Sequence, residues 1–181
     1  MTTQLESKLR DGTAAVAVIG LGYVGLPLAA AFAGSGLKVL GIDLQQKRVD
    51  LVNRGRSYKA GVDEKQLAKL VRSRKLTAFT DHSKLKQADA VCVCVPTPLT
   101  RTRKPDLSHI IYEAEQVSRY LKKGQLVVLE STTFPGTTRE VMLPVLERSG
   151  LKAGRDFYLA FSPGRADPGG AAHTPFNPYP R

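Results

Sequence analysis

Three glycines at the end of the first apolar segment form the strongest chemical motif in the chain. The run Gly20-Leu21-Gly22-Tyr23-Val24-Gly25 has the spacing G-x-G-x-x-G, and Asp43 ends the next apolar run. In that context the first glycine allows a tight turn, the second lets a pyrophosphate approach the backbone, and the third lets a helix pack against a strand. The pattern predicts a dinucleotide-binding turn. The alternative is a turn that needs its glycines for packing only.

The residues around this turn indicate which dinucleotide would bind. The backbone amides at the start of the following helix, including those of Tyr23 and Val24, would face the negatively charged phosphates. The Asp43 carboxylate would accept hydrogen bonds from the hydroxyls of the adenosine ribose, and it would repel the 2′-phosphate of NADP. We therefore predict NAD as the cofactor, and we expect no metal site.

Six short apolar runs would hold the turn in place. They are Ala14–Gly20, Leu37–Asp43, Leu76–Phe79, Ala90–Val95, Leu126–Glu130 and Phe157–Phe161. Each has the length of a strand and is nearly continuously apolar, as in a sheet that is covered on both faces. Their alternation with helical stretches favours parallel strands joined by right-handed crossovers. The predicted fold class is α/β, a doubly wound (Rossmann) parallel sheet of about six strands.

The helical stretches between these runs carry start and stop signals. They are Pro27–Ala33, Gln45–Asn53, Glu64–Lys75, Leu107–Lys122 and Val141–Ser149. Asp106 is predicted to cap the fourth helix, and Thr137 with Glu140 is predicted to form a capping box before the fifth. Gly150 stands where a glycine is expected after a helix.

Composition divides the chain into three parts. Residues 1–13 are polar and are expected to be an N-terminal extension, and residues 14–162 form the predicted dinucleotide-binding domain. Residues 163–181 contain Pro163, Pro168, Pro175, Pro178 and Pro180 without a periodic pattern. Because proline interrupts both helices and central strands, we expect an irregular tail there.

The overall composition excludes several classes of protein. Of the 181 residues, 42% are hydrophobic and 24% are charged, which fits neither a disordered nor a fibrous chain. No apolar stretch reaches the ~20 residues of a membrane span, so we expect no membrane partner. Met1–Asp11 has no signal-peptide core. The two cysteines, Cys92 and Cys94, are too few and too close for a disulfide framework, which favours a cytoplasmic protein.

The chain is strongly basic, with 27 Lys and Arg against 16 Asp and Glu and a net charge of +11. Most of the excess lies between Lys47 and Lys104. This favours anionic partners, although a solvated basic face explains it equally well. The basic residues form no uninterrupted block and have few aromatic residues among them, so we expect no nucleic-acid partner. A nucleic-acid-binding or regulatory module on the same fold is kept as a further hypothesis.

Several segments, in order and spacing, resemble the UDP-glucose/GDP-mannose dehydrogenase family. They are Gly20–Pro27, Val95–Pro98, Pro105–Ser108, Glu130–Thr138 and Phe161–Pro163. The resemblance covers about residues 14–170, and the run Val95–Leu107, with its insert Pro98–Lys104, is most similar to the branch of UDP-N-acetylglucosamine 6-dehydrogenases. It implies NAD-dependent oxidation of the C6 hydroxymethyl group of a UDP-sugar, UDP-N-acetylglucosamine or UDP-glucose, to the uronic acid. It also implies a place in polysaccharide biosynthesis and a homo-oligomer for the full-length family.

The resemblance further implies roles for individual residues. Gly20, Gly22, Tyr23, Val24 and Gly25 would hold the NAD pyrophosphate, Asp43 and Arg48 the adenosine ribose, and Thr97 would line the cofactor cleft. Ser131 and Thr132 would lie beside the nicotinamide, and Thr132 would also help to position the water or proton-transfer network, a catalytic role. Arg165 would contact the substrate. Ordinary exposed arginines and strand-end hydroxyls are the alternatives for Arg48, Ser131, Thr132 and Arg165.

Two departures from the family pattern bear on activity. Gly164 stands where the family has a glutamate that contacts substrate and moves protons, and Asp167 is a poor substitute for it. The family's catalytic cysteine, its central helix and its UDP-binding C-terminal domain have no counterpart here, and we expect Cys92 and Cys94 to be packing residues. We therefore expect this chain to supply the NAD-binding domain and to be inactive alone. The alternative is a non-catalytic NAD-binding fragment or a truncated pseudo-enzyme.

Overall fold

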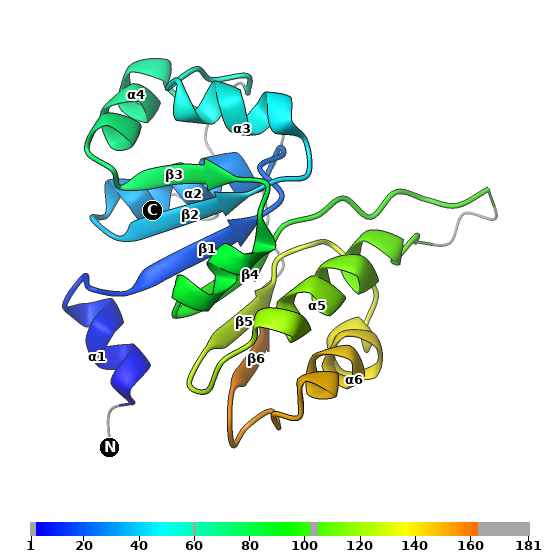
Figure 1. The fold of residues 1–181 in the computed structure, drawn as a ribbon. Helices are drawn as coiled ribbons and strands as arrows, with labels where there is room; N and C mark the ends of the chain where they lie inside the picture. Colours follow the sequence, from blue (N-terminus) through cyan, green and yellow to red (C-terminus); the bar gives the residue numbers. More distant parts are fainter. Residues whose placement is uncertain (1–2, 60, 102–104, 163–181) are drawn as a thin grey trace, which may run out of the picture.

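A parallel sheet forms the centre of the structure (Figure 1). The computed structural model describes residues 3–59, 61–101 and 105–162, and in these residues it has six strands. The strands are β1 (Ala15–Ile19), β2 (Lys38–Ile42), β3 (Leu76–Phe79), β4 (Ala90–Val93), β5 (Leu126–Leu129) and β6 (Tyr158–Phe161). Their order is β3-β2-β1-β4-β5-β6, and every neighbouring pair is parallel. The predicted doubly wound α/β fold is confirmed, with the strand order reversing between β1 and β4.

Helices cover the two faces of this sheet. The α-helices are α1 (Gln4–Arg10), α2 (Gly25–Gly34), α3 (Gln46–Asn53), α4 (Glu64–Arg72), α5 (Ser108–Tyr120) and α6 (Leu143–Leu146). A 3-10 helix spans His82–Gln87, and a π-helical segment, Thr137–Met142, leads into α6. None of the described helices is long and apolar enough to cross a bilayer.

The core consists of two hydrophobic clusters, one on each face of the sheet. On the face that we call the α2 face, Val18 and Cys92 from the sheet pack with Leu26 of α2 and Leu67 of α4. On the opposite α5 face, the sheet packs against Ile110 and Val117 of α5 and against residues of α6. Successive strand residues alternate between the two clusters, so both faces are apolar, and the nearly continuous apolar runs in the sequence follow from this.

Two predicted helix starts are wrong in detail. Leu107, not Asp106, is the N-cap residue of α5, although the Asp106 carboxylate still accepts a hydrogen bond from the Ser108 N–H at 2.9 Å. The predicted capping box of Thr137 and Glu140 does not form, because the Thr137 hydroxyl donates to the Phe134 carbonyl oxygen instead. The Thr137 hydroxyl is therefore bonded to the preceding turn and does not cap the helix. Gly150 ends the helical segment with a φ of 85°, as predicted.

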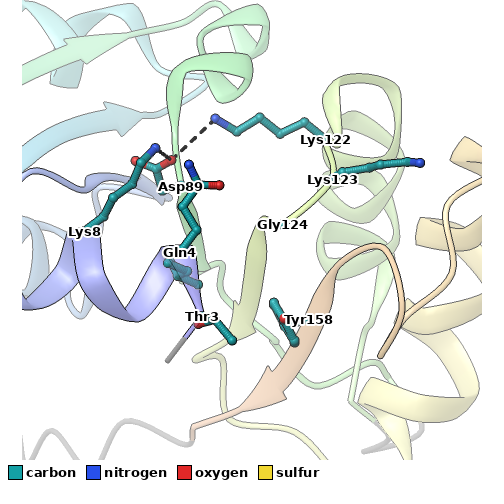
Figure 2. Close-up of a pocket in the computed structure, with 9 residues that line it drawn as sticks. Thr3, Gln4, Lys8, Asp89, Lys122, Lys123, Gly124 and Tyr158 are labelled. Atoms are coloured by element: carbon teal, nitrogen blue, oxygen red, sulfur yellow. Dashed lines mark hydrogen bonds and ion pairs between the residues drawn. The ribbon is translucent and has the colours of Figure 1, made fainter. Parts of the chain in front are cut away.

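The N-terminal extension includes a helix that the sequence reading did not predict. Thr3 and Glu6 form a capping box at the start of α1, with the Thr3 N–H donating to Glu6 Oε2 at 2.7 Å. Lys8 of α1 is paired with Asp89, which precedes β4, at 2.8 Å between Nζ and Oδ1 (Figure 2). Asp89 Oδ2 also accepts a hydrogen bond from the Ala15 N–H at 3.0 Å. One carboxylate thus joins α1, the start of β1 and the start of β4.

A small cavity of about 220 Å³ lies beside this contact, between α1 and the amino ends of the strands. Lys8 and Lys122 both reach toward Asp89 across it, and Tyr158 lies on its other side (Figure 2). The Lys122 Nζ is 3.7 Å from Asp89 Oδ1. The cavity is at the opposite edge of the sheet from the glycine turn, which follows the carboxyl end of β1.

We expect Asp89→Asn to lower the free energy of unfolding by about 1–2 kcal/mol at neutral pH, because it weakens the bonds to Lys8 and Ala15. Burial alone would raise the pKa of Asp89, but the hydrogen bonds from Lys8 and Ala15 and the charge of Lys122 outweigh it, so the pKa lies below its ordinary value. The stabilisation is therefore present above the ordinary carboxyl pKa and is lost as the pH falls through the lowered one. In urea unfolding across the acid range, the unfolding free energy of Asp89→Asn should fall less steeply with decreasing pH than that of the wild type, which gives a flatter acid limb. The matched change at the exposed Asp11 should leave that limb unchanged.

Candidate functional site

The glycine turn lies between β1 and α2, beside the point where the strand order reverses. Gly20 has a φ of 85°, and a Cβ there would come within 2.6 Å of the Cys94 carbonyl oxygen. A Cβ on Gly25 would overlap the carbonyl oxygen of Gly20. Both glycines are therefore required by packing, since they let α2 begin directly against the ends of β1 and β4.

Gly22 is different, because packing does not require a glycine there. A Cβ added to Gly22 would have no atom of the described residues within 4 Å, and its φ is outside the left-handed region. Next to it α2 begins with Val24 at the N-cap, and among the described residues no side chain caps the helix and no acidic residue lies in its first turn. A helix start of this kind attracts phosphate. The open space at Gly22 therefore fits a diphosphate group.

Asp43 is buried at the end of β2, with its carboxylate turned toward the glycine turn. Its Oδ2 accepts hydrogen bonds from the Leu21 N–H at 2.9 Å and from Arg48 Nη1 at 3.2 Å. Its Oδ1 accepts one from the Gln45 N–H at 2.9 Å. These bonds use three of the roughly four acceptor positions of a carboxylate and leave one on Oδ1. Asp43 therefore holds the turn first, and a ribose hydroxyl would join an existing network.

Tyr58, in the loop between α3 and α4, completes this network, and the sequence reading did not identify it. Its hydroxyl donates to the Leu21 carbonyl oxygen at 2.6 Å, so both backbone polar groups of Leu21 bond to side chains. Burial raises the pKa of Tyr58 to about 12; the charge of Asp43 adds to the effect and that of Arg48 opposes it. The phenol therefore stays protonated and able to donate. No local pattern signals this role, since it depends on a loop folding back over the turn.

The carboxyl ends of β4 and β5 bring together three of the predicted site residues. The Thr97 hydroxyl donates to the Thr132 carbonyl oxygen at 2.7 Å, and the Ser131 hydroxyl donates to the Val95 carbonyl oxygen at 2.7 Å. Ser131 is buried, so its hydroxyl serves to join the two strand ends, whereas the Thr132 side chain is exposed. The contacts of Ser131 and Thr132 with a nicotinamide stay predictions. Arg165 lies outside the described residues.

Cys92 and Cys94 lie in and just after β4, and both are buried on the α2 face. Burial, with a smaller contribution from the charge of Glu130, raises the pKa of Cys92 to about 12. Burial and the neighbouring Cys92 and Glu130 raise the pKa of Cys94 well above its ordinary value. Both thiols are therefore protonated at neutral pH and are packing residues, as predicted, because only a thiolate is an effective nucleophile.

Comparison with known proteins agrees with the geometry of this site. The family model that matches residues 14–179 describes the NAD-binding domain of the UDP-glucose/GDP-mannose dehydrogenase family. The chain is 40% identical over 159 residues to the UDP-N-acetyl-D-glucosamine 6-dehydrogenase of Pseudomonas aeruginosa, which is 87% of this chain and 37% of the relative.

Two solved structures are similar to the described fold. A UDP-D-ManNAc dehydrogenase from Pyrococcus horikoshii aligns with a TM-score of 0.81 and 38% identity, over 86% of this chain and 37% of that one. A GDP-mannose dehydrogenase from Pseudomonas aeruginosa aligns with a TM-score of 0.79 and 31% identity, over 82% of this chain and 35% of that one. The chain therefore spans little more than a third of the length of the relatives that it matches.

The two kinds of glycine should respond differently to a single methyl group. We expect Gly22→Ala to keep the unfolding free energy within about 0.5 kcal/mol, because the added Cβ meets open space, and to weaken NAD binding about tenfold or more by occupying the diphosphate position. Gly25→Ala should lower the unfolding free energy by about 2 kcal/mol or more, because its Cβ overlaps backbone. Urea unfolding and calorimetric titration with NAD measure both. Equal destabilisation by the two variants would contradict the assignment of Gly22 to the ligand.

Tyr58→Phe removes the hydroxyl that holds the Leu21 carbonyl oxygen. We expect it to cost about 1 kcal/mol of unfolding free energy and to weaken NAD binding several-fold, because the glycine turn loses one of its two side-chain bonds. Tyr112→Phe, at an exposed position on α5, is the control and should change neither quantity. Unchanged NAD affinity in Tyr58→Phe would show that the turn keeps its shape without this bond.

Proposed function

Because the chain belongs to the UDP-glucose/GDP-mannose dehydrogenase family, we propose that it is the NAD-binding domain of an enzyme that oxidises the C6 hydroxymethyl group of a UDP-sugar to the uronic acid. The observation that carries the proposal is the open backbone at Gly22, at an uncapped helix start and beside the Asp43 network. That combination suits a dinucleotide, with its diphosphate at the helix and its ribose at the carboxylate.

Each residue of the site has a defined part in this proposal. The amides at the start of α2 hold the diphosphate, and the remaining acceptor position of Asp43 takes a ribose hydroxyl. The negative charge of Asp43 disfavours the 2′-phosphate of NADP, even with Arg48 at 3.2 Å, because Arg48 is already paired with that carboxylate. When bound, NAD supplies the acceptor for hydride. Thr97 and Ser131 keep the ends of β4 and β5 together under the nicotinamide half, and the exposed Thr132 faces the reacting groups.

The substrate class is inferred from the relatives. Their names specify a UDP-N-acetyl-D-glucosamine, a UDP-D-ManNAc and a GDP-mannose dehydrogenase, all of them enzymes for sugar nucleotides. The resemblance of Val95–Leu107 to the UDP-N-acetylglucosamine branch makes that sugar our first choice and UDP-glucose the second. We also propose that Arg165 contacts the substrate, that the full-length protein forms a homo-oligomer, and that it acts in the cytoplasm.

The 181 residues are proposed to bind NAD without completing the oxidation. In this family a cysteine thiolate captures the aldehyde, and covalent capture requires an activated nucleophile. The sequence contains two cysteines, and both are buried thiols with raised pKa values. Gly164 in place of the family glutamate supports the second candidate, a non-catalytic NAD-binding fragment.

Calorimetric titration of the 181-residue chain with NAD and NADP tests the cofactor assignment. We expect NAD to bind with a Kd in the micromolar to millimolar range and NADP to bind about tenfold more weakly or worse, the effect of placing a phosphate dianion beside a carboxylate. NADH formation with UDP-N-acetylglucosamine, followed by absorbance, should not exceed background. Absence of NAD binding would contradict the proposal, and turnover would show that another group replaces the thiolate.

A further inference from the structure

A half-buried carboxyl group, that of Glu130, lies at the carboxyl end of β5 and has no part in the site described so far. Its N–H donates to the Val93 carbonyl oxygen at 2.9 Å, so it continues the parallel ladder past the strand. Because side chains alternate along a strand, Glu130 follows Leu126 and Val128 on the α2 face. Ser162 lies just beyond β6, and its N–H donates to the Leu129 carbonyl oxygen at 3.0 Å, which places it beside the end of β5.

On its other side, Glu130 is separated from the glycine turn by the end of β4. Its charge acts on the thiols of Cys92 and Cys94, and the Cβ of Cys94 lies 3.2 Å from the position of a Cβ on Gly25. The order across the sheet is therefore the turn after β1, Cys94 after β4, Glu130 after β5 and Ser162 after β6. They all lie at the carboxyl edge of the sheet, the edge at which a doubly wound fold binds its ligand.

A dinucleotide bound to the turn has to extend along this line. Its adenosine ribose belongs at Asp43, after β2, on one side of the turn, so the second nucleoside extends to the other side, over the ends of β4 and β5. This step rests on the proposed function, because it takes the ligand to be NAD. It brings the nicotinamide half to Glu130.

We propose that Glu130 contacts the nicotinamide half of the cofactor and makes the site prefer NAD to NADH. The oxidised nicotinamide ring carries a positive charge and the reduced ring is neutral, so a nearby carboxylate attracts only the oxidised form. The attraction is effective here because the carboxylate is partly withdrawn from water, where screening is weaker. The preference favours entry of the oxidised cofactor and release of the reduced one.

The environment of the carboxyl group suits this role. Burial raises the pKa of Glu130, and the nearby Ser162 hydroxyl opposes the rise only in part. Because burial makes the charged form of this carboxyl group unfavourable in the free protein, a bound cation would stabilise that form. Among the described residues, the ionisable groups that interact with it are the two neutral thiols of Cys92 and Cys94, so no described lysine or arginine competes with the ring.

Dissociation constants of NAD, NADH and ADP-ribose for the wild type and for Glu130→Gln test the proposal. We expect Glu130→Gln to weaken NAD binding about fivefold, the effect of one partly screened charge pair, and to leave NADH and ADP-ribose within about twofold. Ser162→Ala should give a smaller loss in the same direction. The matched control is Glu115→Gln on α5, a partly buried glutamate that is paired with Arg148 at 3.6 Å on the opposite face of the sheet, and it should change none of the three constants.

A merely structural role of Glu130 would weaken the binding of NAD and NADH equally and leave the ratio of their dissociation constants unchanged. That result would overturn the proposal. If the wild type binds NAD while the ratio is unchanged, the NAD-binding function stands and this inference fails. If the wild type binds neither NAD nor ADP-ribose, both fail. Thermal unfolding of each variant shows that the constants refer to folded protein.

Discussion

The contact between Gly25 and the carbonyl group of Gly20 determines where the rest of the site lies. Because neither residue has a Cβ, α2 begins directly against the ends of β1 and β4, and its uncapped end is at the carboxyl edge of the sheet. The peptide of Leu21, between them, is then held from both sides by Asp43 and Tyr58. A rigid backbone turn beside a helix start lets amide groups bind a phosphate without first being ordered, and so without that entropic cost.

The parts of this arrangement that depend on local sequence were predictable. The apolar runs gave all six described strands to within two residues at each end, because strands covered on both faces need apolar side chains throughout. The spacing of Gly20, Gly22 and Gly25 identified the turn, since its backbone conformation depends on residue type. The Thr3–Glu6 capping box carried an equally local signal, although the polar character of residues 1–13 concealed it.

The parts that depend on distant segments were not predictable. Tyr58 reaches Leu21 from a loop 37 residues away, and Glu130 lies beside Ser162 only because β5 pairs with β6. The family resemblance implies that Ser131 lies beside the nicotinamide, but it does not indicate the hydrogen bond that the Ser131 hydroxyl donates to the Val95 carbonyl oxygen. In the same way, the Thr137 hydroxyl bonds to the Phe134 carbonyl oxygen and does not form the predicted helix cap. A short polar side chain bonds to whichever backbone group lies nearest, and only the folded chain determines which one that is.

The two protonated thiols give this domain an internal reporter of its own opening. Cys92 and Cys94 lie at the middle of the sheet, under α2, so an alkylating reagent reaches them only when the central strands separate. The rate of modification therefore follows the rare opened state rather than the exposure of the native surface. Because ligands that bind only the folded chain make that state rarer, the same rate should slow as the cofactor site fills.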